Sequence, residues 1–224
     1  MGLFTPNYVK PGPGIDKDAP PKTGLALFFE IFIREFWALV KLNVLFLLTC
    51  IPIVTIGAAM GAMTKVTVRM VRDIPNDVWY DYWRGFRENW KASTVLGLIT
   101  ALVYGGGLLG LVLYPAGSAI WLITLAALII LTMVWLYLYP LLTSTTLSFW
   151  DCVRDAILLA MLRFYYSFPV ALLILALIAL EIMFFPLSIP ATLLVGCAIP
   201  NFIASFLAWS GIQKHILSPE KSEI

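Results

Sequence analysis

The sequence of 224 residues has few charged side chains, few cysteines and one histidine. Only 12% of its residues are charged and 61% are hydrophobic, whereas about 25% charged residues is usual in soluble domains. Fifteen Lys and Arg against 13 Asp and Glu give a formal net charge of +2, and without a long run of one sign we expect no nucleic-acid binding. Because each membrane span needs about 20 apolar residues, this composition predicts an integral membrane protein without a large separate soluble domain.

Residue patterns that support catalysis or metal binding are also scarce. Cys50, Cys152 and Cys197 are too widely spaced, and odd in number, for a disulfide framework or a metal cluster. The chain has no GxxxxGK[ST], HExxH or GxSxG pattern, and no carboxylate or cysteine pattern accompanies His215. We therefore expect neither enzymatic activity nor a cofactor nor a metal site.

The chain divides into three parts. Residues 1–24 contain five prolines and four glycines, which favours an irregular tail, and they lack the apolar core of a secretory signal. Residues 25–212 form the predicted helical membrane domain, and residues 213–224 a C-terminal tail.

The first helix is predicted to begin at Leu25 and to lie at the membrane surface. Charged side chains recur on one side and aromatic ones fill the other, which is typical of an interfacial helix. The apolar stretch that follows, residues 42–64, is broken by Pro52 and Gly57. It forms either one kinked span or two helices that reverse near Pro52.

The reversal is the preferred alternative because it brings charges of opposite sign to one side of the membrane. Charges inside a membrane protein need partners. We expect Glu30 and Glu35 to pair with Lys65, Arg69 or Arg72.

Four further spans are predicted at 93–113, 119–142, 168–185 and 190–209. The connections before the first, between the second and third, and after the last carry Lys and Arg, while the other two carry no charge. By the positive-inside rule, a multi-pass protein of the plasma membrane is expected, with the C-terminus and the N-terminus cytoplasmic. The fold class is thus all-α, with five to six transmembrane helices plus amphipathic helices at the cytoplasmic interface.

Residues 77–91 are predicted to form the more prominent amphipathic helix. Its aromatic side chains are spaced i, i+4, i+7 and i+11, and charged side chains including Asp81 occupy the other sides. Such a helix is either an anchor at the headgroup level or a docking helix for a cytoplasmic partner. The candidate docking residues are Trp79, Trp83, Phe86, Trp90, Arg84 and Arg87. Residues 151–164 repeat the arrangement more weakly, with Val153, Ile157, Met161 and Phe164 as the apolar face.

Two pairs of glycines, Gly57 with Gly61 and Gly106 with Gly110, are each four residues apart. Small residues at this spacing let another helix approach closely, so these four are candidate helix-packing residues. The glycines of residues 105–110 also fit GxGxxG, but no strand precedes them, which excludes a nucleotide site.

Two polar residues are predicted inside spans. Glu181 is a functional candidate because an ionisable group in lipid is costly, although it is close to the outer interface. Asn201 is expected to form hydrogen bonds between helices.

Several segments carry a family resemblance: KPGPGIDKDAP at 10–20, FFEIF at 28–32, KLN at 41–43, CIPIVTIG at 50–57 and the aromatic and basic stretch at 79–91. With these the chain resembles the YesL-like family of membrane proteins of unknown function from Gram-positive bacteria. Many relatives have Gly-Pro-Ala-Thr-Ala where this sequence has Ala-Ala-Met-Gly-Ala at 58–62.

The resemblance implies a setting rather than a reaction. Members are commonly encoded beside carbohydrate ABC importers and glycoside hydrolases. This implies an accessory, non-catalytic membrane subunit that stabilises or regulates such an importer, with the permease and ATPase subunits and membrane lipids as partners. The alternative is a stand-alone small carrier or channel for a sugar or an ion, built around Glu181 and Asn201.

Overall fold

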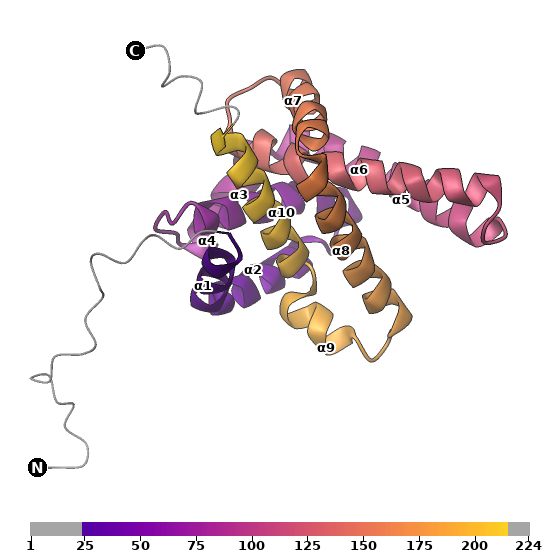
Figure 1. The fold of residues 1–224 in the computed structure, drawn as a ribbon. Coiled ribbons are helices and arrows are strands. Elements are labelled where there is room, and N and C mark those ends of the chain that lie inside the picture. Colours follow the sequence, from indigo (N-terminus) through magenta and orange to yellow (C-terminus); the bar gives the residue numbers. More distant parts are fainter. Residues whose placement is uncertain (1–23, 215–224) are drawn as a thin grey trace, which may run out of the picture.

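The computed structural model describes residues 24–214, and every regular element within them is a helix (Figure 1). Four helices are long and apolar enough to cross a membrane: α5 (Trp90–Leu113), α6 (Ala119–Ser144), α8 (Phe164–Met183) and the stretch Ile189–Ile212. This confirms the all-helical membrane fold, and each of these four helices overlaps one of the four later spans predicted from the sequence. The predicted N-terminal tail before Gly24, and His215 with the rest of the C-terminal tail, lie outside the described residues.

The N-terminal part contains four helices, of which the first three are α1 (Leu25–Arg34), α2 (Phe36–Thr49) and α3 (Ile56–Val71). A 3₁₀ turn at Ile53–Thr55 connects α2 to α3. An ion pair of 2.6 Å joins Arg34, the last residue of α1, to Asp73, two residues after the end of α3. The chain therefore reverses near Pro52, and the alternative of one kinked span is wrong.

The predicted pairing of Glu35 with Lys65, Arg69 or Arg72 is wrong. Lys65 pairs with Glu88 and Arg69 with Asp81, both on α4 (Val78–Glu88), and the Arg72 guanidinium lies 4.4 Å from the ring centre of Trp209. Helix α4 folds back onto α3, so its carboxylates reach the basic side chains. Glu35 instead contacts its neighbour Arg34 at 3.2 Å.

Helix α3 is the centre of the packing. It buries most of its 16 residues and contacts α4, α5, α6 and α10 (Ala198–Ile212). Small side chains such as Ala59 and Ala62, both fully buried, let four neighbours approach one helix.

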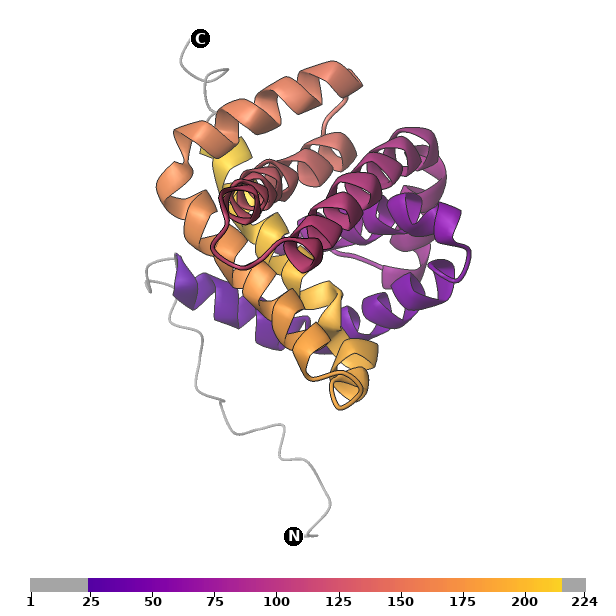
Figure 2. The ribbon, with the colours of Figure 1, turned by 90° about the vertical axis from the view of Figure 1, so that its right-hand side faces the viewer.

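The remaining elements follow α6. Helix α7 (Phe149–Leu162) lies across the top of the molecule in Figure 2, a view in which the α5–α6 hairpin is seen nearly end-on. Helix α8 then leads through a turn to α9 (Ile189–Ala191), a π-helical segment (Thr192–Gly196) and α10. The α5–α6 hairpin and the α8–α9 turn project from the rest of the chain (Figure 1).

The residues that α7 buries within the protein are not those of its predicted apolar face. Its inward residues are small or slim, namely Cys152, Ala156, Leu159 and Ala160. Of the predicted face, Val153 is partly buried, whereas Ile157, Met161 and Phe164 are exposed. Close packing selects small side chains, and the larger apolar ones on this helix face outward.

Candidate functional site

Helix α4 presents the most distinctive surface of the described chain, and its start is fixed by reciprocal hydrogen bonds. The Asp77 carboxylate accepts a hydrogen bond from the Tyr80 N–H at 3.1 Å, and the Asp77 N–H donates to the Asp81 carboxylate at 3.1 Å. An acidic side chain at this position satisfies free N–H groups of the first turn. Asp81 is thereby held in a buried position, where it pairs with Arg69 at 3.2 Å.

The inward face of α4 is fitted closely to the N-terminal helices. Tyr82 is fully buried, and its phenol oxygen lies 2.5 Å from the Thr49 hydroxyl oxygen at the end of α2. A Cβ on Gly85 would lie 3.3 Å from the Cα of Ala62, so a glycine at this position allows α3 to come close. Burial raises the pKa of the Tyr82 phenol above its ordinary value.

Glu88, the last residue of α4, interacts with one basic side chain on α3 and one on α4 itself. It forms an ion pair with Lys65 of α3 and accepts a hydrogen bond from Nε of Arg84 at 2.7 Å. These two hydrogen bonds hold the pKa of the Glu88 carboxyl below its ordinary value. Charge pairing thus adds to apolar packing in holding α4 in one orientation.

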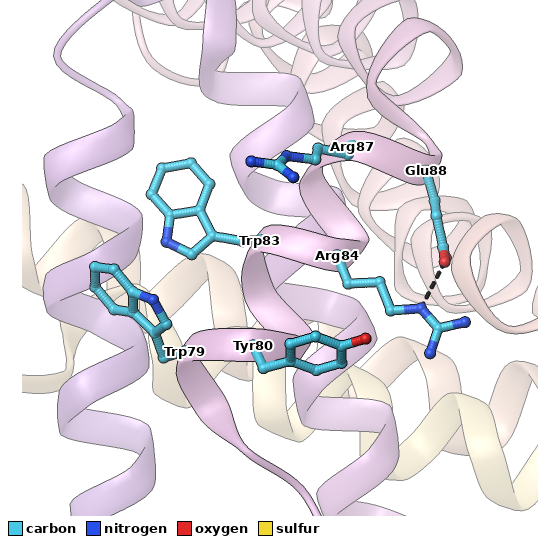
Figure 3. A pocket seen from close by; sticks show the side chains of 6 residues that line it. All are labelled: Trp79, Tyr80, Trp83, Arg84, Arg87 and Glu88. Carbon is cyan, nitrogen blue, oxygen red and sulfur yellow. Dashed lines mark hydrogen bonds and ion pairs between the residues drawn. The ribbon is translucent and has the colours of Figure 1, made fainter.

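The outward face of α4 forms a shallow pocket of about 550 Å³, drawn in Figure 3. We call this the α4 face; it comprises Trp79, Tyr80, Trp83, Arg84, Arg87 and Glu88. Trp79 and Tyr80 are each more than 60% exposed, and Trp79 meets Trp83 edge-on at 6.0 Å. Within residues 24–214, no hydrogen bond or ion pair involves the exposed Arg87 guanidinium, whereas Arg84 is held by Glu88.

The α4 face differs in part from the predicted aromatic stripe. Trp83 and Phe86 are partly buried against the core, whereas Trp79 and Trp90 are exposed. Trp90 belongs to the next element, because α4 ends at Glu88 and α5 begins at Trp90. The structure brings Trp79, Trp83, Arg84 and Arg87 together and places Phe86 and Trp90 outside the pocket.

The predicted glycine contacts are unequal. A Cβ on Gly57 would lie 2.9 Å from the Cα atoms of Gly97 and Thr94, and Gly61 lies against Ser93, so both allow α3 to approach α5. Gly110 contacts Thr124 of α6, but a Cβ on Gly106 would meet nothing within 4 Å. The neighbouring Gly107 packs on Leu128 of α6 instead. The face of α5 that contacts α6 is therefore rotated by one residue from the predicted face.

Asn201 forms the predicted hydrogen bonds between helices. Its amide nitrogen donates to the Thr64 hydroxyl at 2.9 Å, and its amide oxygen accepts from the Thr67 hydroxyl at 2.8 Å. Thr67 also lies 2.7 Å from the Ser205 hydroxyl. This buried polar cluster joins α3 to α10.

Glu181 lies apart from that cluster, near the end of α8. It is partly exposed, and its carboxylate lies against Gly196 of the π-helical segment. The Ser188 hydroxyl donates to the Glu181 main-chain carbonyl at 2.7 Å. The two intramembrane polar candidates are therefore not brought into one site.

Asn43 is the polar residue that the sequence-based interpretation missed. Its side chain is fully buried and donates to the carbonyls of Thr192 and Leu193 at 2.9 and 2.8 Å. Its oxygen accepts from the N–H groups of Cys197 and Ala198 at 3.0 Å each. An asparagine in an apolar helix was the available signal, because only a bonded amide is tolerated there.

The described residues offer little for metal or thiol chemistry. No group of three His, Cys, Asp or Glu side chains within 24–214 could hold a metal ion. Cys50, Cys152 and Cys197 are free thiols.

Comparison with known proteins gives one match. Residues 39–114 match the family DUF624, described as a protein of unknown function, and this agrees with the YesL-like resemblance. The matched segment includes α4 whole and the tight contact between α3 and α5. The searches of curated proteins and of solved structures gave no match.

Proposed function

We propose that this chain, of which residues 39–114 match the family DUF624, is a non-catalytic accessory subunit that stabilises or regulates a carbohydrate ABC importer of the plasma membrane. The observation that carries the proposal is the α4 face. It combines exposed aromatic rings with an exposed Arg87 guanidinium. Aromatic residues and arginine are the residue types enriched at the centres of protein interfaces.

The attachment of α4 supports docking over simple anchoring. An interfacial anchor needs only an amphipathic helix. Helix α4 is additionally held by buried Tyr82 and by ion pairs from Asp81 and Glu88 to α3. A rigidly held surface loses less conformational entropy when a partner binds.

The apolar helices supply a second surface for a membrane partner. The most apolar window of α5 is only 6% buried within the chain. Gly105 and Gly106 lie on its open side, where a helix of the permease could approach closely.

The stand-alone carrier is less well supported. It needs polar groups that are available to a substrate, but the amides of Asn201 and Asn43 are engaged in helix packing. The Glu181 carboxylate lies against Gly196. Of the two intramembrane polar residues predicted from the sequence, it is the one whose side chain forms no hydrogen bond within residues 24–214.

Co-purification tests the proposal. The tagged chain, extracted in mild detergent, should bring down permease and ATPase subunits of a carbohydrate importer, identified by mass spectrometry. Trp79→Ala with Arg87→Glu should reduce this recovery at least tenfold. Trp150→Ala on α7 is the matched control, because Trp150 is also exposed, 76% against 63% for Trp79, but lies outside the α4 face.

Two results would contradict the proposal. One is recovery of the chain alone, with carbohydrate uptake unchanged when its gene is deleted. The other is flux of sugar or ions through liposomes containing only this protein, abolished by Glu181→Gln, which would favour the carrier.

A further inference from the structure

Both carboxylates of helix α4 are already engaged by basic side chains of this chain. Asp81 is buried in its ion pair with Arg69 of α3. Glu88 is shared between Lys65 of α3 and Arg84 of α4. The negative charge of α4 is therefore used to hold the helix against α3 and to fix Arg84.

Arg87 carries the charge that these contacts leave over. Its side chain is exposed, and within the part of the chain that the structure describes it makes no hydrogen bond, ion pair or ring contact. Two arginines and Lys65 lie near the single carboxylate of Glu88, so the α4 face has a surplus of positive charge. A partner that matches this surface in charge brings a negative group.

The aromatic rings of the α4 face lie on the same side of the helix as Arg87. Trp79, Trp83 and Arg87 follow one another at a spacing of four residues, which places them along one side of a helix. In Figure 3 their side chains lie on one side of α4, whereas Arg84 pairs with Glu88 on the other. The free cation therefore continues a strip of aromatic rings.

The length of this strip limits what can cover it. Trp79 and Arg87 are eight residues apart, or about 12 Å along the helix axis. An extended segment of about four residues spans this length. The pocket of about 550 Å³ is of a size that takes a few side chains rather than a folded domain.

The way in which α4 is attached favours a protein over lipid as the occupant. Tyr82 and Asp81 are buried on the inward side of the helix, and Glu88 adds an ion pair to α3. Rings and charge are thus held in a fixed arrangement before binding. Such preorganisation strengthens binding to a partner of matching shape, whereas mobile lipid headgroups take up no single arrangement.

Resting on the proposed function, we propose that the occupant of the α4 face is a short acidic segment of the partner protein. About four extended residues place a carboxylate on the Arg87 guanidinium and an apolar side chain against Trp79 and Trp83. Pairs of arginine with carboxylate are frequently bidentate, so this contact fixes the direction in which the segment lies. The proposed function names the partner complex, and this proposal names the chemistry of the segment that binds.

Photo-crosslinking from within the pocket identifies the occupant. Tyr80 is 62% exposed in the α4 face and is replaced by p-benzoylphenylalanine in the full chain, in membranes of the native host. After irradiation, the crosslinked peptides are sequenced by mass spectrometry. The expected product is a protein segment with Asp or Glu within about four residues of an apolar side chain.

Charge variants then test the contact with Arg87. Arg87→Gln should lower the crosslink yield at least about tenfold, with helix content unchanged by circular dichroism. Arg154→Gln on α7 is the matched control, because Arg154 is also exposed and makes no hydrogen bond or ion pair within residues 24–214; it should leave the yield unchanged. Arg87→Glu should abolish the crosslink, and exchange of the acidic residue of the partner segment for Arg should restore it.

Three results would overturn the acidic segment: crosslinks to lipid alone, crosslinks to a segment without Asp or Glu, and a yield with Arg87→Gln equal to that of the wild type. The result also separates this proposal from the proposed function. An acidic segment on a protein outside any carbohydrate importer would support the segment and contradict the function. A segment without Asp or Glu on an importer subunit would do the reverse.

Discussion

Replacing Asn43 by leucine is expected to weaken the joint between α2 and the last span. The substitution removes four hydrogen bonds of 2.8 to 3.0 Å to the main chain of Thr192, Leu193, Cys197 and Ala198. Hydrogen bonds between membrane helices contribute about 0.6 kcal/mol each on average. The free energy of unfolding should therefore fall by about 2–3 kcal/mol.

The measurement is reversible unfolding in mixed micelles, followed by circular dichroism at increasing SDS. Val44→Leu is the matched control, because Val44 is the next residue on α2 and is exposed. A loss below about 0.6 kcal/mol, the value of one average bond, would refute the reasoning. It would mean that the last span recovers regular helical hydrogen bonds when the asparagine is removed.

Three further predictions concern packing and charge. Gly57→Val should cost about 1–3 kcal/mol of unfolding free energy through overpacking, whereas Gly105→Val, with nothing within 4 Å, should cost nothing measurable; equal effects would contradict the contact. Tyr82→Phe should cost about 0.5–1.5 kcal/mol because one hydrogen bond is lost, and an unchanged unfolding midpoint would argue against that bond. The lowered pKa of Glu88 contributes stability that is present above about pH 4.3, the ordinary value, and lost at lower pH. Wild type should thus exceed Glu88→Gln in stability at pH 7, with the difference shrinking as the pH falls, and a constant difference would exclude the ion pair with Lys65 as its source.

Much of the fold could be predicted from the sequence because the hydrophobic signal is strong. The long apolar runs of α5, α6, α8 and the last span were located to within a few residues. Pro52 correctly indicated a reversal, whereas Gly57 lies inside α3 and does not break it. Asn201 was correctly assigned to packing, since an amide in an apolar helix needs a partner.

The predictions that were wrong concern contacts that depend on which helices become neighbours. Lys65 and Arg69 had several carboxylates within reach along the chain, and only the return of α4 onto α3 selects Glu88 and Asp81. The packing of Gly107 in place of Gly106 depends on a rotation of α5 by one residue, which periodicity does not specify in a helix that is apolar all round.

The α4 face was partly predictable for a similar reason. The aromatic spacing revealed that residues 77–91 are amphipathic. It did not reveal that Tyr82 and Gly85 form the inward contact, because a buried tyrosine needs the hydroxyl of Thr49 from a distant helix.

The position of Asn43 has a consequence for biosynthesis. Its hydrogen-bonding partners follow it by 149 to 155 residues. At about 5–20 residues per second, synthesis of that interval takes roughly 8–30 s. During this time the amide has no partner from the last span, so the early hairpin must wait in a place where water or lipid headgroups can satisfy it. The last span to leave the ribosome therefore completes the first hairpin, and a chain truncated before residue 192 should leave its N-terminal helices exposed to quality-control proteases.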